Sequence, residues 1–339
     1  MTTISMLING QQKQASNGKT FERKSPLDGK GATTAPAANA LDAKTEDFIK
    51  AMAGETGSAA MWAGFNAHLA ANMLREAASL TTQINGDLIP SDVPGSLAMG
   101  VRQPAGVVLG MAPWNAPIIL GTRAVAVPLA CGNTVVMKGS EVCPATHSLI
   151  IESLQEAGLP NGVVNFITND PADAGPLVEA MIAHPAVKRV NFTGSTRVGR
   201  IIASVCAKHL KPSILELGGK APLVVLDDAN IEEAVNGTAF GAFANSGQIC
   251  MSTERIIVDN KIADTFIPAL TEKARNLPLG DPREGPVVLG SVVDMTTVER
   301  CNALIDDALE KGAKLLCGGK AENTLMPATL IDHVTPQMR

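Results

Sequence analysis

Short apolar runs alternate with amphipathic segments along most of the chain from about residue 104. The runs predict strands covered on both faces, because a half-exposed strand would alternate apolar with polar residues. The segments between them repeat apolar residues at helical spacing, as at positions 198, 201, 202, 205 and 206. The predicted strands are 105–111, 134–137, 163–167, 188–192, 223–226, 255–258 and 314–317. The predicted helices are 145–157, 172–183, 195–210, 231–245, 263–276 and 297–311.

The order of these elements predicts an α/β fold in which helices cover a parallel sheet. The order restarts beyond Glu216, where Gly218 and Gly219 give the backbone the freedom of a hinge. A chain of 339 residues is long enough for two domains. We therefore expect a first domain at residues 1–215 and a second at residues 216–339.

The composition is that of a folded protein with an aliphatic core. Hydrophobic residues make up 45% of the chain and charged residues 18%, which provides a large core and argues against global disorder. Aromatic residues reach only 3%, with no Tyr, so the core must be mainly aliphatic. The net charge of −5 argues against a surface that binds nucleic acid or anionic lipid.

The six cysteines are widely spaced, without a CxxC pair or a His at metal-ligand spacing. This pattern argues against a metal site or a disulfide framework and favours a reducing compartment. The N-terminus lacks the pattern of a signal peptide. The uncharged run 103–122 is long enough to span a bilayer, but it contains three prolines and is followed by Arg123, so we expect a buried strand, loop and helix there. We expect a soluble, cytoplasmic protein.

Cys250 and Glu216 are the candidate catalytic pair, and each stands among small residues, in the stretches 243–250 and 215–220. A thiolate is strongly nucleophilic near neutral pH, and a carboxylate within reach can act as general base for water. Together they indicate covalent catalysis through a thioester. A free Cys is also commonly a small buried hydrophobe, as we expect for the other five. We expect Glu216 to be buried within an apolar run, where a carboxylate is costly without a task or a partner.

Three further stretches follow predicted strands, the position at which parallel sheets bind ligands. Residues 192–199 can turn backbone N–H groups toward a pyrophosphate, although they have fewer glycines than the usual dinucleotide fingerprint and also fit a plain turn with Ser195 as N-cap. Lys138 can pair with ribose or phosphate oxygens. Glu141 can accept from a free ribose hydroxyl, which favours NAD over NADP; an exposed loop is the alternative for both residues. Asn115 can donate to a developing oxyanion, or form an Asx turn.

Five stretches together resemble the aldehyde dehydrogenase superfamily, in the family's order and across nearly the whole chain. They are 113–115, 138–141, 192–199, 215–222 and 247–250. Within the family, residues 57–79, 85–96 and 250–255 resemble bacterial vanillin and salicylaldehyde dehydrogenases. The resemblance implies a Rossmann-like parallel-sheet domain that binds NAD, with an oligomerisation hairpin near 85–110, and an α/β catalytic domain.

The resemblance also implies a division of labour. Cys250 would attack the aldehyde carbonyl, and the oxyanion would lie between the Asn115 amide and the Cys250 backbone N–H. After hydride transfer to NAD, Glu216 would activate the water that hydrolyses the thioester to a carboxylic acid. Trp62 and Arg123 are expected to contact an aromatic aldehyde that bears a hydroxyl. The residues expected to hold NAD are Trp114, Lys138, Glu141, Gly194, Ser195 and Leu217.

Chains of this family are longer than this one. Their Glu-x-Phe-Gly-Pro segment would follow Arg339, and helices are missing near 43–45, so we expect a C-terminal truncation, an internal deletion and an incomplete catalytic domain. The first hypothesis is an NAD-dependent dehydrogenase of aromatic aldehydes, whose full-length relatives are homo-oligomers. The second is a non-catalytic remnant that binds nucleotide weakly or associates with full-length subunits. Glu216, as hydrolytic base, argues against a third, an acylating dehydrogenase that releases the thioester to coenzyme A.

Overall fold

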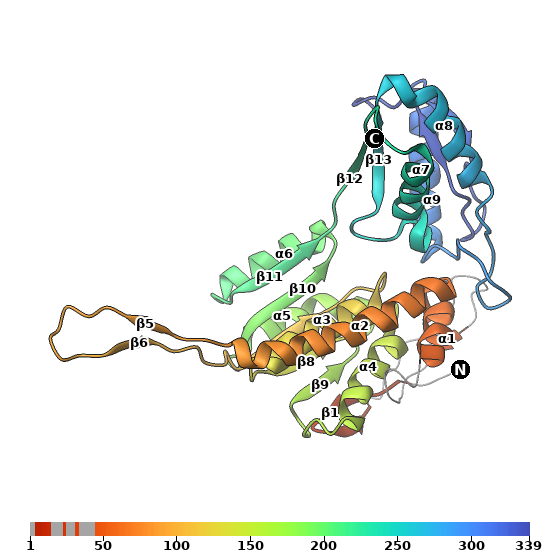
Figure 1. The fold of residues 1–339 in the computed structure, drawn as a ribbon. Coiled ribbons are helices and arrows are strands. Elements are labelled where there is room, and N and C mark those ends of the chain that lie inside the picture. Colours follow the sequence, from red (N-terminus) through yellow and green to blue (C-terminus); the bar gives the residue numbers. More distant parts are fainter. Residues whose placement is uncertain (1–3, 15–22, 25–30, 34–44) are drawn as a thin grey trace.

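The computed structural model describes residues 4–14, 23–24, 31–33 and 45–339, which form a mixed α/β structure with two lobes (Figure 1). The first lobe is built on a seven-stranded sheet. Its parallel strands are β7 (Val107–Met111), β8 (Thr134–Lys138), β9 (Val164–Ile167), β10 (Val187–Gly194) and β11 (Ser213–Leu217). Two antiparallel strands, β1 (Met6–Ile8) and β2 (Gln11–Lys13), extend one edge, so that the order is β11-β10-β7-β8-β9-β1-β2.

Helices cover both faces of this sheet (Figure 1). Alternate strand residues point to opposite faces, so Val108 packs with one group of helices, while Leu109 and Met111 pack with the other. The first group is α1 (Thr45–Thr56), α2 (Ala60–Leu80), α3 (Pro117–Ala130) and α4 (Pro144–Glu156). The second is α5 (Ala174–Ala183) and α6 (Thr196–Lys208), with the short turn η2 (Pro171–Asp173) before α5. The prediction that apolar strands are covered on both faces is therefore confirmed for the central strands β7 and β8. It was wrong for the predicted strands 223–226 and 255–258, where Val224 and Ile257 are exposed.

The second lobe has its own small sheets and its own core. Strand β12 (Ala221–Val225) pairs in parallel with β13 (Thr253–Val258), and β14 (Lys314–Cys317) pairs with β15 (Leu330–Asp332) in antiparallel fashion. The helices of this lobe are α7 (Ile231–Phe243), α8 (Asn260–Arg275) and α9 (Met295–Glu310). Phe243, Phe266 and Leu289 lie in its core. The predicted division at 215/216 falls inside β11, a strand of the first lobe's sheet, and the assignment of two domains stays a prediction.

Every strand and helix predicted from the hydrophobic pattern has a counterpart among these elements. The run 103–122 forms β7, a loop and the start of α3, as expected. In the part of the chain that the structure describes, no helix has the length and apolar character needed to cross a membrane. The pattern did not identify the helices α1 and α2, or several strands, among them β1, β2, β11 and β15.

The segment near 85–110 contains the predicted hairpin. Strands β5 (Asp87–Ile89) and β6 (Ala98–Gly100) pair in antiparallel fashion and project away from the first lobe (Figure 1). The short helical turn η1 (Thr81–Gln83) leads from α2 into this hairpin. Its role in oligomerisation stays a prediction. The predicted deletion near 43–45 lies outside the described residues apart from Thr45, the first residue of α1; two short strands before it, β3 (Arg23–Lys24) and β4 (Gly31–Thr33), pair with each other.

A buried carboxylate joins α1 to the start of α4. Glu55 is 1% exposed, and its Oε1 accepts from the Ala145 backbone N–H at 2.8 Å. Its Oε2 accepts from the Thr146 backbone N–H at 3.0 Å and from the Thr146 hydroxyl at 2.7 Å. The first N–H groups of a helix have no partner within it, and the helix dipole favours a negative charge there. Glu55 therefore fixes the N-terminus of α4, which follows directly on the loop after β8.

His147 in the first turn of α4 is fully buried. Its Nδ1 accepts from the Ser140 backbone N–H at 3.1 Å, and the ring also bonds to the Pro117 carbonyl at the start of α3. Burial, followed by the nearby charge of Lys138, lowers the pKa of His147 from 6.5 to about 3. His147 is therefore a neutral side chain whose hydrogen bonds connect α4 to α3 and to the loop after β8.

His147 should make the free energy of unfolding depend on pH. Between pH 6.5 and about 3 the unfolded chain binds a proton at this ring and the folded chain does not. Its contribution is therefore complete above pH 6.5 and is lost as the pH falls, by about 2 kcal/mol on reaching about pH 5. We expect His147→Gln, which keeps an acceptor, to flatten the pH dependence measured by urea unfolding. The exposed His68→Gln is the control, and equal slopes for His147→Gln and the unaltered protein would refute the assignment.

Candidate active site

The parallel strands end in line at one edge of the sheet. Met111 in β7 is in register with Lys138 in β8 and with Phe192 in β10, and Lys138 is in register with Ile167 in β9. The loops that follow these strands therefore leave the sheet side by side. Carboxyl edges of parallel sheets are where such folds bind ligands. The predicted cofactor and oxyanion residues lie at the last positions of these strands or in the loops that follow them.

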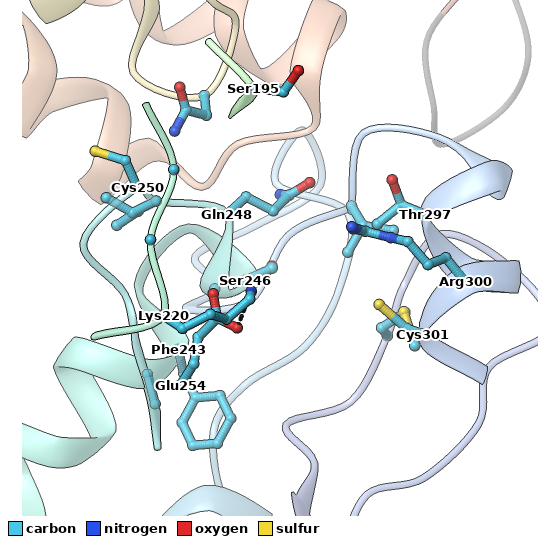
Figure 2. Close-up of a pocket in the computed structure, with 18 of the residues that line it drawn as sticks. Ser195, Lys220, Phe243, Ser246, Gln248, Cys250, Glu254, Thr297, Arg300 and Cys301 are labelled. Atoms are coloured by element: carbon cyan, nitrogen blue, oxygen red, sulfur yellow. Dashed lines mark hydrogen bonds and ion pairs between the residues drawn. The ribbon is translucent and has the colours of Figure 1, made fainter. Parts of the chain in front are cut away.

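A cavity of about 730 Å³ opens at this edge and is bounded by both lobes (Figure 2). The first lobe contributes the loops after β7, β10 and β11, and the second contributes residues 246–250 and part of α9. Seven of the predicted site residues line it. They are Trp114, Asn115, Gly194, Ser195, Glu216, Leu217 and Cys250. The structure thus brings together all three predicted catalytic residues.

The backbone before Cys250 is held in an unusual conformation. Within the turn η3 (Ala244–Gly247), Asn245, Ser246 and Gly247 have φ angles of 50°, 55° and 73°. Two consecutive non-glycine residues in the left-handed region carry strain that surrounding contacts must offset. The Ser246 hydroxyl donates to the Gly290 carbonyl at 3.2 Å, and the Gln248 amide donates to the Asn245 carbonyl at 3.1 Å. These bonds fix the approach of the chain to Cys250.

Asn245 connects this turn to the first lobe. Its side chain is buried; Nδ2 donates to the Asn115 carbonyl at 3.0 Å, and Oδ1 accepts from the Ser58 hydroxyl at 3.0 Å. The Asn115 carbonyl also accepts from Nε1 of Trp62 at 2.9 Å. The backbone of Asn115 is therefore held in a fixed place relative to the turn that carries Cys250.

Trp62 is 6% exposed and does not line the cavity. Its one N–H donor is already bonded to the Asn115 carbonyl. In the structure Trp62 therefore supports the backbone of Asn115 from outside the cavity. Its contact with an aromatic substrate stays a prediction.

Glu216 differs from the sequence-based expectation, because its side chain is exposed. It lies in β11, the edge strand of the sheet, where one neighbouring strand is missing and alternate residues remain open to solvent. The expectation of a buried carboxylate was therefore wrong. An exposed carboxylate beside the cavity keeps contact with water, which a base that activates water requires.

Cys250 is half-buried. In Figure 2 its thiol points away from Arg300 on α9. Among the other cysteines, Cys143, Cys206 and Cys317 are buried as expected, but Cys131 and Cys301 are half-exposed, so the expectation of five buried cysteines was wrong for two of them.

The N-terminus of α6 faces the cavity. The Ser195 hydroxyl accepts from the Val198 N–H at 3.3 Å and caps the helix, while Ser195 itself is exposed and lines the cavity. A side chain at Gly199 would place its Cβ 2.5 Å from the end of the Leu217 side chain, which would then have to move. The N-cap interpretation and the ligand-binding interpretation of Ser195 are compatible, since the cap uses the Val198 N–H and leaves the preceding N–H groups of the helix start for a ligand.

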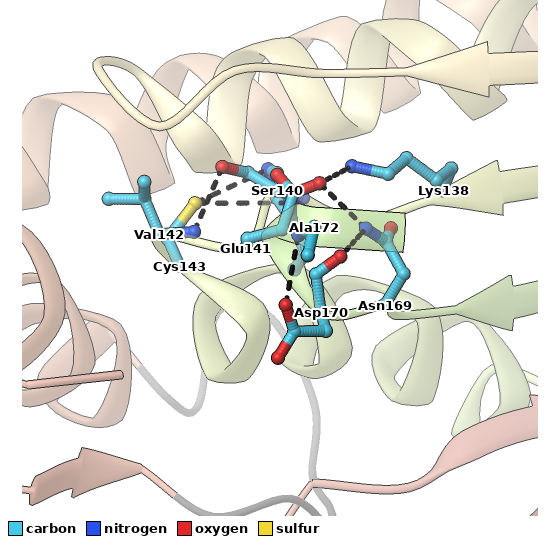
Figure 3. Close-up of polar contacts among 9 residues, drawn as sticks. Lys138, Ser140, Glu141, Val142, Cys143, Asn169, Asp170 and Ala172 are labelled. Carbon is cyan, nitrogen blue, oxygen red and sulfur yellow. Dashed lines mark hydrogen bonds and ion pairs between the residues drawn. The ribbon is translucent and has the colours of Figure 1, made fainter. Parts of the chain in front are cut away.

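Lys138 and Glu141 form a separate polar cluster after β8 (Figure 3). Lys138 is 7% exposed and makes an ion pair with Glu141, so the alternative of an exposed loop is wrong for Lys138. Nδ2 of Asn169 donates to Oε1 of Glu141 at 3.0 Å. Burial alone would raise the pKa of Glu141, but the Lys138 charge and the hydrogen bonds from Lys138 and Asn169 outweigh it and lower the pKa below its ordinary value. Glu141 is therefore a fixed, ionised acceptor.

Arg123 lines a second cavity, of about 1150 Å³, between α3 and the exposed face of β10 and β11. Its Nη2 donates to the Thr193 hydroxyl at 3.1 Å, and Thr193 lines the first cavity. Glu216 lines both cavities. Arg123 is thus close to the site, and its contact with substrate stays a prediction.

Sequence reasoning missed several residues that line the first cavity. Thr297, Arg300 and Cys301 face it from α9, on the side opposite Cys250 (Figure 2). Lys220 lines it as well and pairs with Glu254. Their helix and loops were predicted, but only the packing of the second lobe shows which faces turn toward the cavity. Among the described residues, no group of three or more His, Cys, Asp or Glu side chains is placed to hold a metal ion.

The chain was compared with known proteins. The family described as "Aldehyde dehydrogenase family" matches residues 8–339. Vanillin dehydrogenase of Pseudomonas fluorescens is 55% identical over 100% of this chain and 77% of its own length. Salicylaldehyde dehydrogenase of Pseudomonas putida is 53% identical over 89% of this chain, and the match spans 63% of that protein.

Solved structures show the same relationship. The crystal structure of a salicylaldehyde dehydrogenase from Pseudomonas putida G7, complexed with salicylaldehyde, superposes with a TM-score of 0.96 and 45% identity, over 100% of this chain and 78% of that one. An NAD-dependent benzaldehyde dehydrogenase from Corynebacterium glutamicum has a TM-score of 0.91 at 30% identity, over 100% of this chain and 81% of that one. By its sequence, its fold and the cavity between its lobes, the chain belongs to the aldehyde dehydrogenase family.

Proposed function

We propose that this chain oxidises an aromatic aldehyde to the carboxylic acid with NAD⁺, through a thioester on Cys250. The observation that carries the proposal is the single cavity lined by Cys250, Asn115 and Glu216. The names of the similar proteins, which include vanillin, salicylaldehyde and benzaldehyde dehydrogenases, support an aromatic substrate.

In the first step the Cys250 thiolate adds to the aldehyde carbonyl carbon, and the carbonyl oxygen becomes an oxyanion. The Asn115 side-chain amide and the Cys250 backbone N–H are the donors for this oxyanion. Such donors are effective when they are already in place before the reaction. The bonds from Trp62 and Asn245 to the Asn115 carbonyl provide that order.

The residues at the sheet edge fit a nicotinamide dinucleotide. The capped start of α6 offers free N–H groups to a pyrophosphate, while Lys138 and Glu141 offer a cation and a carboxylate to a ribose diol. A Cβ at Gly194 would lie 2.4 Å from the Phe192 ring, so a larger residue at this turn would displace that ring. The bound nicotinamide supplies the acceptor for the hydride that leaves the former carbonyl carbon, and Cys250 is left as a thioester. Some similar proteins use NADP, and the ionised Glu141 is the feature that favours NAD here.

In the last step Glu216 accepts a proton from a water molecule, and the resulting hydroxide attacks the thioester carbonyl. The carbon–sulfur bond breaks, the Cys250 thiolate leaves, and the carboxylic acid is released. Glu216 suits this role because its carboxylate is exposed and borders both cavities, so water has access to it throughout.

Replacement of the nucleophile tests the proposal most directly. We expect Cys250→Ser to lower NADH production from vanillin by at least about a thousandfold, because a serine hydroxyl is not ionised near neutral pH. Cys301→Ser is the matched control, since that thiol lines the same cavity. A purified chain that shows no turnover but a saturable, NAD-dependent rise in Tm would instead support the non-catalytic hypothesis.

Glu216→Gln should separate the two halves of the reaction. Thioester formation does not require this base, so we expect a burst of about one NADH per chain in rapid mixing. The steady rate should then fall about a hundredfold, as expected for loss of a general base. Mass spectrometry should find the acyl group on Cys250. Glu254→Gln, in the same cavity, is the control; a lost burst in Glu216→Gln would contradict the assigned role.

Arg123 is proposed to recognise a ring hydroxyl of the substrate. We expect Arg123→Ala to lower the ratio of kcat/KM for hydroxylated over plain benzaldehydes about tenfold, the value of one hydrogen bond to a charged group. The loss of the hydrogen bond to Thr193 could lower kcat/KM for both substrates. The ratio of the two kcat/KM values is not affected by such a common decrease. Arg102→Ala, in the same cavity, is the control. An unchanged ratio would remove Arg123 from the substrate site.

A further inference from the structure

The carboxylate of Glu141 is held from two directions (Figure 3). Lys138, the last residue of β8, and Asn169, just beyond β9, both donate to the same oxygen, Oε1. Two donors on one oxygen fix the plane and direction of a carboxylate, whereas one donor leaves it free to turn about that bond. Oε2 takes part in neither of these side-chain bonds, and the Glu141 backbone N–H also bonds to the carboxylate. The arrangement thus directs the group without occupying Oε2 by either neighbouring side chain.

The Asn169 amide points its NH₂ group toward Glu141, and this orientation leaves its oxygen without a hydrogen bond from any described residue. Its Nδ2 donates to Glu141 and also to the Asp170 carbonyl at 2.7 Å. Its Oδ1 is buried and has no hydrogen-bond partner among the described residues. The reversed amide would place an oxygen against the Glu141 carboxylate, and two acceptors repel. The need of Glu141 for a donor therefore determines the orientation of Asn169.

We propose that Asn169 is a positioning residue for cofactor choice, which holds Glu141 so that its carboxylate accepts a free ribose 2′-hydroxyl and rejects a 2′-phosphate. This inference rests on the proposed NAD site and adds to it a residue of this chain.

The charges of Lys138 and Glu141 explain how the neutral Asn169 amide can influence the choice between NAD and NADP. With Glu141 in place, the Lys138 ammonium is already paired, and the carboxylate repels any further anion. If Glu141 turns away, the same ammonium becomes available to a 2′-phosphate. Asn169 prevents that change because it holds Glu141 over Lys138 without adding charge of its own.

The ribose site can be tested without turnover. Adenosine 5′-monophosphate and adenosine 2′,5′-bisphosphate differ only in the 2′-phosphate, and their Kd values are measured by calorimetry. We expect the unaltered chain to prefer the monophosphate. In Asn169→Leu, which has a similar size but no donor, we expect this preference to fall about tenfold, the effect of one hydrogen bond to a charged group.

Asn165→Leu is the matched control. Asn165 lies in β9, and its amide bonds to the Gly162 carbonyl and to the Asn9 N–H, without contact to Glu141. The preference should be unchanged in this variant. Should Asn169→Leu fail to fold, Asn169→Ser, which is smaller and polar, replaces it. With NAD⁺ and NADP⁺ as cofactors, the Asn169 variants should change KM for the cofactor but not kcat or KM for the aldehyde.

The possible outcomes separate this inference from the proposed function. An unchanged preference in the Asn169 variants, or equal weakening of both nucleotides, would overturn the role of Asn169 while the cofactor site stands. Equal loss of preference in Asn165→Leu would assign the effect to general damage and also overturn it. If the unaltered chain binds neither nucleotide, the proposed cofactor site fails, and the inference fails with it.

Discussion

The parallel register of five strands is the constraint on which the site depends. Met111 in β7 is paired with Lys138 in β8 and with Phe192 in β10, so neighbouring strands end on one line. Each following loop then delivers its polar residue to the same edge, where Asn115 and Ser195 line one cavity although they are far apart in the sequence. A shift of one strand by one residue would turn its side chains to the opposite face and remove its loop from this edge.

The second lobe must place Cys250 against that edge, and it does so through a strained turn. Left-handed residues such as Asn245 and Ser246 cost about 1–3 kcal/mol each. The buried Asn245 amide offsets this cost, because it bonds both to Ser58 and to the Asn115 carbonyl of the first lobe. The contact that stabilises the turn is therefore also the contact that holds Cys250, the proposed nucleophile, near Asn115, the proposed oxyanion donor.

Local patterns in the sequence were sufficient for the α/β fold and for most helices and strands from β7 onward, because strands and helices depend on neighbouring positions. Short motifs and the family resemblance supplied the proposed catalytic residues, which the structure places around one cavity. Features that depend on packing were not predictable in this way. Glu216 is exposed because β11 is an edge strand, which no local pattern reveals. Arg300 faces the cavity only because of how α9 packs. Asn169 reaches Glu141 only because β8 and β9 are neighbours in the sheet.

Glu141 and Glu216 lie at one sheet edge in different environments, and these environments suit the different tasks proposed for them. Glu141 is half-buried and held by Lys138 and Asn169, and its lowered pKa keeps it ionised, which suits a group that must bind without changing its charge. Glu216 is exposed and borders two cavities, so it can exchange protons with water between turnovers. A base that was fixed and desolvated like Glu141 would have no route for its proton, and a binding group as open as Glu216 would not discriminate between ligands. The difference in environment therefore suits the proposed roles, binding for the first carboxylate and proton transfer for the second.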